Sequence, residues 1–227
     1  MLLAKWEELP DYMQNAQARR YYEILQNKKA SLFAKRALDL IISVILILLL
    51  ILPMCAIAAV VKAGSPGKIL FRQDRVTTNG RIFKILKFRT MVEGAESLGG
   101  QITETDDKRI TKNGKFLRKY RLDELPQIFN VFTGAMSLVG TRPEVPKYVK
   151  KYTPEMYATL LMPAGVTSYA SIHFRDEDEL FRDPSTVEKN YMEVVLPEKM
   201  EQNLKYIEEF SFLYDLKIMV RTIADVF

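Results

Sequence analysis

The residues from Leu40 to Val61, LIISVILILLLILPMCAIAAVV, carry no charged side chain and limit the possible folds more than any other stretch. As one straight helix this run would measure about 33 Å, at about 1.5 Å per residue, which is enough to cross a bilayer. Pro53 lies inside the run, where proline removes a helical hydrogen bond and bends or breaks a helix. The run therefore predicts a membrane element that is interrupted near Pro53.

Basic residues flank the apolar run on both sides, with Lys35 and Arg36 before it and Lys62 and Lys68 after it. Cytoplasmic flanks of membrane segments are enriched in lysine and arginine, so two basic flanks favour a segment that enters and leaves by the cytoplasmic face. From these residues alone, a re-entrant helix–break–helix and an ordinary kinked span both remain open. Asp39 lies close to the first basic pair and predicts an interfacial ion pair.

Two adjacent carboxylates, Asp123 and Glu124, stand in RLDELPQIFNVF, just ahead of a proline and an apolar run with helical spacing. Asp123 is a candidate N-cap, and Pro126 fits the first turn, where backbone amides lack helical partners. The positive end of the helix dipole would keep a carboxylate ionised and would attract phosphate. A capped helix with an acidic first turn and no function is the alternative interpretation.

A β-hairpin is predicted where ILFRQDRV and RIFKILKFRT flank Thr77-Thr78-Asn79-Gly80, since Asn-Gly is a strong hairpin signal. The alternation of side chains along a strand places Lys87 and Arg89 on one face. Two neighbouring cations at a strand end can bind phosphate. A solvated strand end is the alternative.

The remaining segments predict helices and loops packed around this hairpin, within an α+β fold that is mostly helical. Arg142 lies in a turn-rich segment, GAMSLVGTRPEVP, and Arg175 precedes a run of acids that suggests a solvated helix start. The other expectations are a surface helix on the membrane or the domain (9–30), a loop (93–114), short helices broken at Pro154 (144–161), an extended stretch after residue 162, a helix interrupted before Pro197 (186–210) and an amphipathic helix on the membrane or the core (211–227). The expected organisation is an N-terminal surface helix (1–34), a membrane element (35–63) and one further domain (64–227).

Composition excludes some kinds of site. One cysteine, Cys55, permits no disulfide within the chain, and the single histidine, His173, argues against a metal site built from several histidines. The chain has 33 Lys and Arg against 28 Asp and Glu, a mild excess that suits lipid, nucleotide or phosphate partners. Because the basic residues are dispersed and no aromatic residues are interleaved with them, nucleic acid is not an expected partner.

In this order, the motifs resemble those of the monotopic phosphoglycosyltransferases, also called bacterial sugar transferases. The resemblance extends from about residue 35 to about residue 220 and is most specific where the LDELPQ and GTRPE blocks follow KFRTM. The matching segments are KRALDL with the apolar run, ILFRQDRV, FKILKFRTM, RLDELPQIFNVFTGAMSLVGTRPE and SFLYDLKI.

The resemblance implies transfer of a sugar 1-phosphate from a UDP-sugar to a polyprenyl phosphate such as undecaprenyl phosphate, with release of UMP. It also implies a requirement for Mg²⁺, a re-entrant membrane helix, and a place on the cytoplasmic face of the bacterial inner membrane, at the first membrane step of a glycan pathway. Relatives often carry Ser-Pro at the helix break, whereas this chain has Leu52-Pro53. A homodimer and downstream glycosyltransferases are further partners that the resemblance allows.

The resemblance also assigns roles to individual residues. Asp123 matches the family nucleophile, which forms a covalent phosphosugar intermediate, and Glu124 matches its partner; both are expected to serve the metal. The cations expected to bind substrate phosphate are Arg142, Lys87, Arg89 and Arg175. Asn203 stands where many relatives carry an acid, and it receives no role.

Two other functions fit parts of the sequence. A glycosyltransferase that moves the sugar alone would release UDP instead of UMP. A basic membrane-anchored adaptor would need no catalytic carboxylate, so the replacement of Asp123 would leave its cellular role intact.

Overall fold

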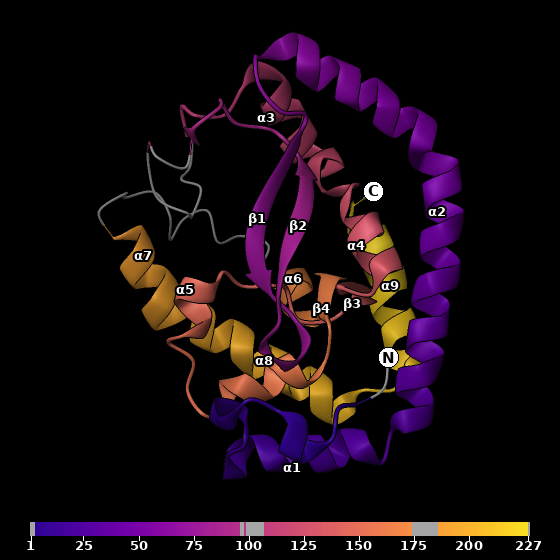
Figure 1. The fold of residues 1–227 in the computed structure, drawn as a ribbon, viewed down its shortest axis with the longest axis vertical. Coiled ribbons are helices and arrows are strands. Elements are labelled where there is room, and N and C mark those ends of the chain that lie inside the picture. Colours follow the sequence, from indigo (N-terminus) through magenta and orange to yellow (C-terminus); the bar gives the residue numbers. More distant parts are fainter. Residues whose placement is uncertain (1–2, 96–97, 99–106, 174–185, 227) are drawn as a thin grey trace.

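The computed structural model describes residues 3–95, 98, 107–173 and 186–226, and it is mostly helical with two small sheets (Figure 1). The longer helices are α1 (Ala16–Gln26), α2 (Lys29–Gly64), α3 (Lys112–Lys119), α4 (Gln127–Thr133), α8 (Leu196–Glu209) and α9 (Phe212–Val226). The shorter helical segments are η1 (Trp6–Glu8), η2 (Asp11–Met13), η3 (Thr78–Gly80), η5 (Leu122–Glu124), α5 (Pro146–Val149), η6 (Met156–Leu161), α6 (Tyr169–His173), α7 (Val187–Asn190) and the π-helical η8 (Tyr191–Val195). The strands are β1 (Leu70–Val76), β2 (Ile82–Phe88), β3 (Met136–Val139) and β4 (Ala164–Thr167).

Helix α2 runs along one side of the molecule and bends in its upper part (Figure 1). The expected break at Pro53 is wrong in one respect, because the helix continues through this residue from Lys29 to Gly64. The backbone torsion of proline is compatible with a helix, so the lost hydrogen bond permits a bend without ending the helix. In the described part of the chain, α2 is the one helix long and apolar enough to cross a membrane.

Much of the apolar surface of α2 is exposed. Leu48, Leu49 and Leu52 expose 72%, 67% and 79% of their surface, which is unusual for leucines in a folded domain. The opposite face packs on the rest of the protein, where Met54 and Val61 join Phe88 and Leu117 in a small core. The uncharged part of α2, residues 40–61, therefore has one face against the protein and one exposed apolar face.

The main core joins the two ends of the chain. Tyr22 and Leu25 of α1 are buried in the same cluster as Leu196 and Ile207 of α8. Of the two expectations for the N-terminal helix, packing on the domain is therefore confirmed.

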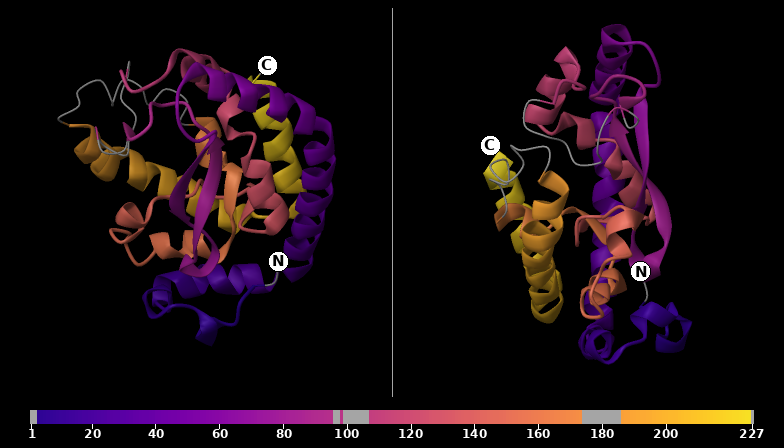
Figure 2. Two further views of the ribbon diagram at one scale, coloured as in Figure 1. Left: turned by 45° about the horizontal axis from the view of Figure 1, so that its top comes forward. Right: turned by 90° about the vertical axis from the view of Figure 1, so that its left-hand side faces the viewer.

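The predicted hairpin is present, with β1 and β2 antiparallel and η3 at the turn. Asn79 in this turn has a positive φ of 58°, which Asn tolerates better than most residues. The hairpin lies on one side of the molecule, and α8 and α9 lie on the opposite side (Figure 2).

A second sheet was missed by the sequence analysis, which read GAMSLVGTRPEVP as turns only. In this segment β3 pairs in parallel with β4, and Gly140 and Gly165 lie so close that a Cβ atom on either would clash with backbone. Strands of four residues are too short to show a clear alternation of apolar side chains. The extended stretch expected after residue 162 is confirmed as β4.

The C-terminal helices resolve two further expectations. The expected interruption before Pro197 is a π-helical turn, η8, and the backbone around it stays helical. In α9, Asp215 and Ile218 are buried, which confirms packing on the core for this face. Leu213 and Val220 are exposed, so a membrane contact for the outer face stays a prediction.

Candidate active site

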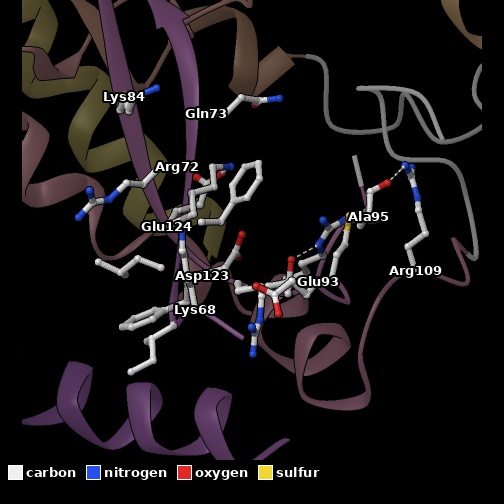
Figure 3. A pocket seen from close by; sticks show the side chains of 18 of the residues that line it. Lys68, Arg72, Gln73, Lys84, Glu93, Ala95, Arg109, Asp123 and Glu124 are labelled. Atoms are coloured by element: carbon white, nitrogen blue, oxygen red, sulfur yellow. Dashed lines mark hydrogen bonds and ion pairs between the residues drawn. The ribbon is translucent and has the colours of Figure 1, made fainter. Parts of the chain in front are cut away.

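An open cleft of about 2070 Å³ lies between the hairpin, the loop after β2 and the segments that carry residues 118–124 and 142–147. Figure 3 shows Asp123 and Glu124 near its centre, with Arg72, Gln73 and Lys84 on the hairpin side. Lysine and arginine outnumber the carboxylates along the lining, so the cleft is suited to an anionic ligand.

Glu124 is held by two of the expected phosphate-binding cations. Its Oε1 accepts hydrogen bonds from Lys87 Nζ and from Arg142 Nη2, each at 2.7 Å, and its side chain is 14% exposed. Burial alone would raise the pKa of Glu124, but the charges and hydrogen bonds of Arg142 and Lys87 hold that pKa well below its usual range. Glu124 is therefore a fixed anion that orients two cations.

Asp123 is in a different state, although it is the next residue. It is 8% exposed, and its carboxylate makes no hydrogen bond or ion pair with any side chain that the structure describes. Burial raises the pKa of Asp123, Lys87 and Arg118 oppose this rise with their charges, and the Glu124 charge adds to it. The arrangement leaves Asp123 as a buried carboxylate with unused acceptor atoms.

The expectation that Asp123 caps the following helix is wrong. Asp123 lies inside the 3-10 turn η5, and Pro126 precedes α4 with helical torsion angles. The backbone already turns helically one turn earlier, where Leu125 N donates to Leu122 O, so no capping position remains for Asp123. Arg121, just before this turn, has a positive φ of 53°, a conformation that costs a non-glycine residue roughly 1–2 kcal/mol.

Asn130 explains how Lys87 reaches Glu124. The Asn130 side chain accepts a hydrogen bond from Leu86 N at 3.0 Å and donates one to Lys84 O at 3.0 Å, which fixes α4 along the edge of β2. Lys87 follows directly and meets the acid at the start of this helical segment. The sequence analysis missed Asn130; a lone amide in the apolar run IFNVF was the available signal.

Arg142 lies just after a strand of the second sheet. It follows β3 after Gly140 and Thr141, and Thr141 O accepts a hydrogen bond from Gly165 N at 2.8 Å. The Glu124 charge is the main cause of the raised pKa of Arg142, so this cation keeps its charge at any working pH. Strand β3, which the sequence did not predict, therefore positions Arg142, which the sequence did predict as a phosphate-binding cation.

Arg89, another expected phosphate-binding residue, lines the same cleft but does not contact Glu124. Its Nη2 donates to Ser65 O at 2.7 Å and to Ser65 Oγ at 2.8 Å, next to the end of α2. Its Nε and Nη1 are buried and have no partner in the part of the chain that the structure describes. Arg175, the fourth expected cation, lies outside the described residues.

Arg118 belongs to the cleft as well, although the sequence analysis gave it no role. Its Nε donates to Thr90 Oγ1 at 2.9 Å, and its charge lowers the pKa of Asp123. The basic residues immediately before the two acids were the available signal.

A metal ion at this site would find few protein ligands. Among the described residues no group of three or more His, Cys, Asp or Glu side chains could surround an ion. Asp123 fits a magnesium ligand because its carboxylate forms no ion pair with any described residue, whereas Glu124 already faces two cations. Mg²⁺ commonly takes one or two carboxylates and completes its shell with water and substrate phosphate, which is compatible with this arrangement.

The family model for the bacterial sugar transferases matches residues 30–227, which is most of the chain. This chain is a bacterial sugar transferase. The match includes α2, the hairpin, the acid pair and the segment that carries Arg142.

Curated relatives of this bacterial sugar transferase carry names that specify their substrates. The UDP-N-acetylgalactosamine-undecaprenyl-phosphate N-acetylgalactosaminephosphotransferase of Aeromonas hydrophila is 37% identical over 86% of the chain and 44% of its own length. The UDP-glucose:undecaprenyl-phosphate glucose-1-phosphate transferase of Escherichia coli K12 is 37% identical over 83% and 39%. A transferase with this second name from Caulobacter vibrioides is 35% identical over 85% and 69%. The chain thus spans less than half the length of the first two relatives, and these names include two different sugars.

Proposed function

We propose that this bacterial sugar transferase moves a sugar 1-phosphate from a UDP-sugar to a polyprenyl phosphate, with undecaprenyl phosphate as the acceptor, and releases UMP. The names of its relatives support the class of donor and acceptor. The observation that carries the proposal is the contrast between the two neighbouring acids. Glu124 Oε1 is bound by Lys87 and Arg142, whereas Asp123 is buried, lines the cleft and has no side-chain partner among the described residues.

In the first step an oxygen of the Asp123 carboxylate attacks the β-phosphorus of the donor. A bond forms between this oxygen and phosphorus, and the bond from phosphorus to the bridging oxygen breaks. UMP leaves with the bridging oxygen and its electron pair, and an aspartyl phosphosugar remains on the protein. Because no cation or hydroxyl among the described residues is hydrogen-bonded to Asp123, the carboxylate needs to break no ion pair with them before it attacks.

In the second step a phosphate oxygen of the lipid attacks the same phosphorus. The acyl phosphate bond breaks, the Asp123 carboxylate is restored, and the product is a polyprenyl diphosphosugar. Lys87 and Arg142 have the role of holding the non-bridging oxygens in both steps, and Glu124 keeps these cations charged and in place.

Magnesium is part of the proposal through Asp123. When bound, Mg²⁺ would neutralise the negative charge of the diphosphate, and Asp123 is the residue that would hold it. Glu124 as a second metal ligand stays a prediction, since its Oε1 is already engaged by two cations.

The membrane arrangement is a second part of the proposal. We propose that α2 enters and leaves the inner membrane by the cytoplasmic face, with its exposed apolar side against lipid. The bend in α2, the basic residues at both ends and the exposed leucines support this arrangement (Figure 1). Lys62, near the end of α2, lines the same cleft as Asp123. A lipid phosphate at the headgroup level would therefore have a short path to Asp123.

The reaction is tested by incubating the purified protein with UDP-sugars and undecaprenyl phosphate and identifying the released nucleotide. UMP, together with a labelled phosphosugar adduct on Asp123 when the lipid is omitted, is the expected result. Release of UDP would replace the proposal by transfer of the sugar alone. A protein that turns over no UDP-sugar would favour the adaptor function.

The topology is tested by labelling single cysteines in intact cells, in a Cys55→Ala background because Cys55 is exposed. Ala30→Cys and Ala63→Cys place exposed thiols near the two ends of α2. Re-entry predicts that both are labelled from the cytoplasmic side alone, and labelling from opposite sides would show a simple span. Pro53→Ala favours a straight helix by up to about 3 kcal/mol and should shift the population towards spanning.

A further inference from the structure

We infer that three residues at the start of α2, namely Lys35, Arg36 and Asp39, position the active site by holding the two segments that carry its charged groups. The catalytic consequence rests on the proposed function, whereas the geometry itself does not. None of the three lines the cleft, so they act through other residues and touch no substrate.

Arg36 holds the segment that carries the acid pair. Its Nη1 donates to Val131 O at 2.7 Å and its Nη2 donates to Phe132 O at 2.9 Å, so one guanidinium binds two carbonyls at the end of α4. A cation at this end also complements the helix dipole. Helical hydrogen bonds continue from α4 back through Leu125 to Leu122, which includes the turn with Asp123 and Glu124. By binding the end of this continuous helical segment, Arg36 therefore helps to fix the position of the two acids at its start.

Lys35 and Asp39 hold the segment that carries Arg142. Asp39 Oδ1 accepts a hydrogen bond from Leu138 N at 3.0 Å, and Lys35 Nζ donates to Val139 O at 2.7 Å. Both contacts are with consecutive residues of β3, which is followed by Gly140, Thr141 and then Arg142. The expectation of an ion pair between Asp39 and its basic neighbours is wrong, because Asp39 binds backbone and Lys35 pairs with Asp215 at 2.6 Å.

These contacts complete a ring. From α2 the ring follows α4 to Glu124, crosses the 2.7 Å contact to Arg142, and returns through β3 to α2. Lys35 and Asp39 are each 4% exposed, so neither side chain has room to move without breaking a buried hydrogen bond. The ring places Arg142 on Glu124, so this cation does not pair with Asp123.

The test compares two replacements of Asp39. Asp39→Asn keeps an oxygen that accepts from Leu138 N, and Asp39→Leu removes it. In each background a double-mutant cycle with Glu124→Gln and Arg142→Gln measures the coupling between these residues through thermal unfolding. We expect strong coupling in the wild-type and Asp39→Asn proteins and a loss of most of it in Asp39→Leu. Unchanged coupling in Asp39→Leu, or none in the wild-type protein, would overturn the inference, even if the protein has another activity.

Arg36→Gln provides a second variant at a site that is only partly buried, so the protein is expected to fold. Under the proposed reaction, we expect the kcat of folded Arg36→Gln to fall by about tenfold or more with little change in the donor KM, since displacements of about 1 Å can cost about a hundredfold. A residue with a merely structural role would lower the melting point and leave the kcat of the folded molecules unchanged. That outcome, with wild-type enzyme releasing UMP normally, contradicts the inference and leaves the proposed function standing.

Discussion

Two buried charged clusters of this protein differ in how completely their hydrogen bonds are satisfied. At the start of α2, Lys35 binds Asp215 and a backbone carbonyl, and Asp215 also accepts a hydrogen bond from Tyr206 at 2.6 Å. In the cleft, Asp123 has no side-chain partner, and Arg89 has two buried nitrogens without one in the described part of the chain. Since an unpaired buried charge costs free energy, the protein pays for this second cluster, and an incoming ligand can use the free atoms.

The largest expected effect comes from the cleft, at Asp123. Asp123→Asn removes the proposed nucleophile and should lower kcat by more than about a thousandfold, as the loss of a covalent catalyst commonly does. The midpoint of thermal unfolding should rise, because burial of Asp123 in the folded protein raises its pKa and so disfavours its charged form at neutral pH.

The two readouts for Asp123→Asn are UMP release and thermal unfolding of the same preparation. Glu124→Gln is the matched control, since its pKa is lowered in the fold and loss of its charge should lower stability instead. Full activity in Asp123→Asn would remove the proposed nucleophile.

The cluster at the start of α2 should show a large effect on stability. Lys35→Met leaves Asp215 buried without its cation, and this should destabilise the protein by roughly 3–5 kcal/mol, measured by denaturant unfolding. The double variant Lys35→Met with Asp215→Asn removes both charges, keeps an acceptor for the Tyr206 hydroxyl and should recover part of the loss.

Lys84→Met is the control for this comparison. Lys84 pairs with Asp74 at 2.8 Å, but the two side chains are 62% and 53% exposed, so a cost below about 1 kcal/mol is expected. Equal losses in Lys35→Met and Lys84→Met would show that burial does not separate the two kinds of pair.

A smaller effect is expected where a cleft cation keeps its charge and loses its shape. Arg142→Lys retains a positive charge near Glu124 but loses the planar fork of N–H donors. Transition-state stabilisation should fall by roughly 1–3 kcal/mol, on the scale of a charge-assisted hydrogen bond, measured as kcat/KM for the donor. Kinetics identical to wild type would place Arg142 outside the substrate contacts.

The smallest effect concerns pH. As pH falls, kcat/KM should decline through the pKa of Asp123, which lies above the ordinary aspartate value, while Glu124 stays ionised because its pKa is lowered. Arg118→Gln removes a charge that lowers the pKa of Asp123, so the acidic limb should move to higher pH. Lys147→Gln, a cleft residue paired with Glu188, should leave the limb in place. A limb that moves equally in both variants would mean that Arg118 has no specific effect on Asp123.

The sequence by itself determined the elements whose signals are local. The long apolar helix, the hairpin around Asn-Gly and the acid pair ahead of an apolar helix follow from composition and spacing over short stretches. The motifs also led to the family, and they singled out Lys87 and Arg142, which the structure brings together on Glu124.

Only the tertiary structure decided which charged groups meet. The sequence placed Asp39 beside Lys35 and Arg36, yet all three bind segments far away in the sequence and make no ion pair with one another. The sequence expected both Asp123 and Glu124 to serve a metal, whereas two cations hold Glu124 and no described side chain binds Asp123. The physical reason is that the energy of a charge depends on burial and on partners within a few ångströms, and the chain brings those partners from residues far apart in sequence.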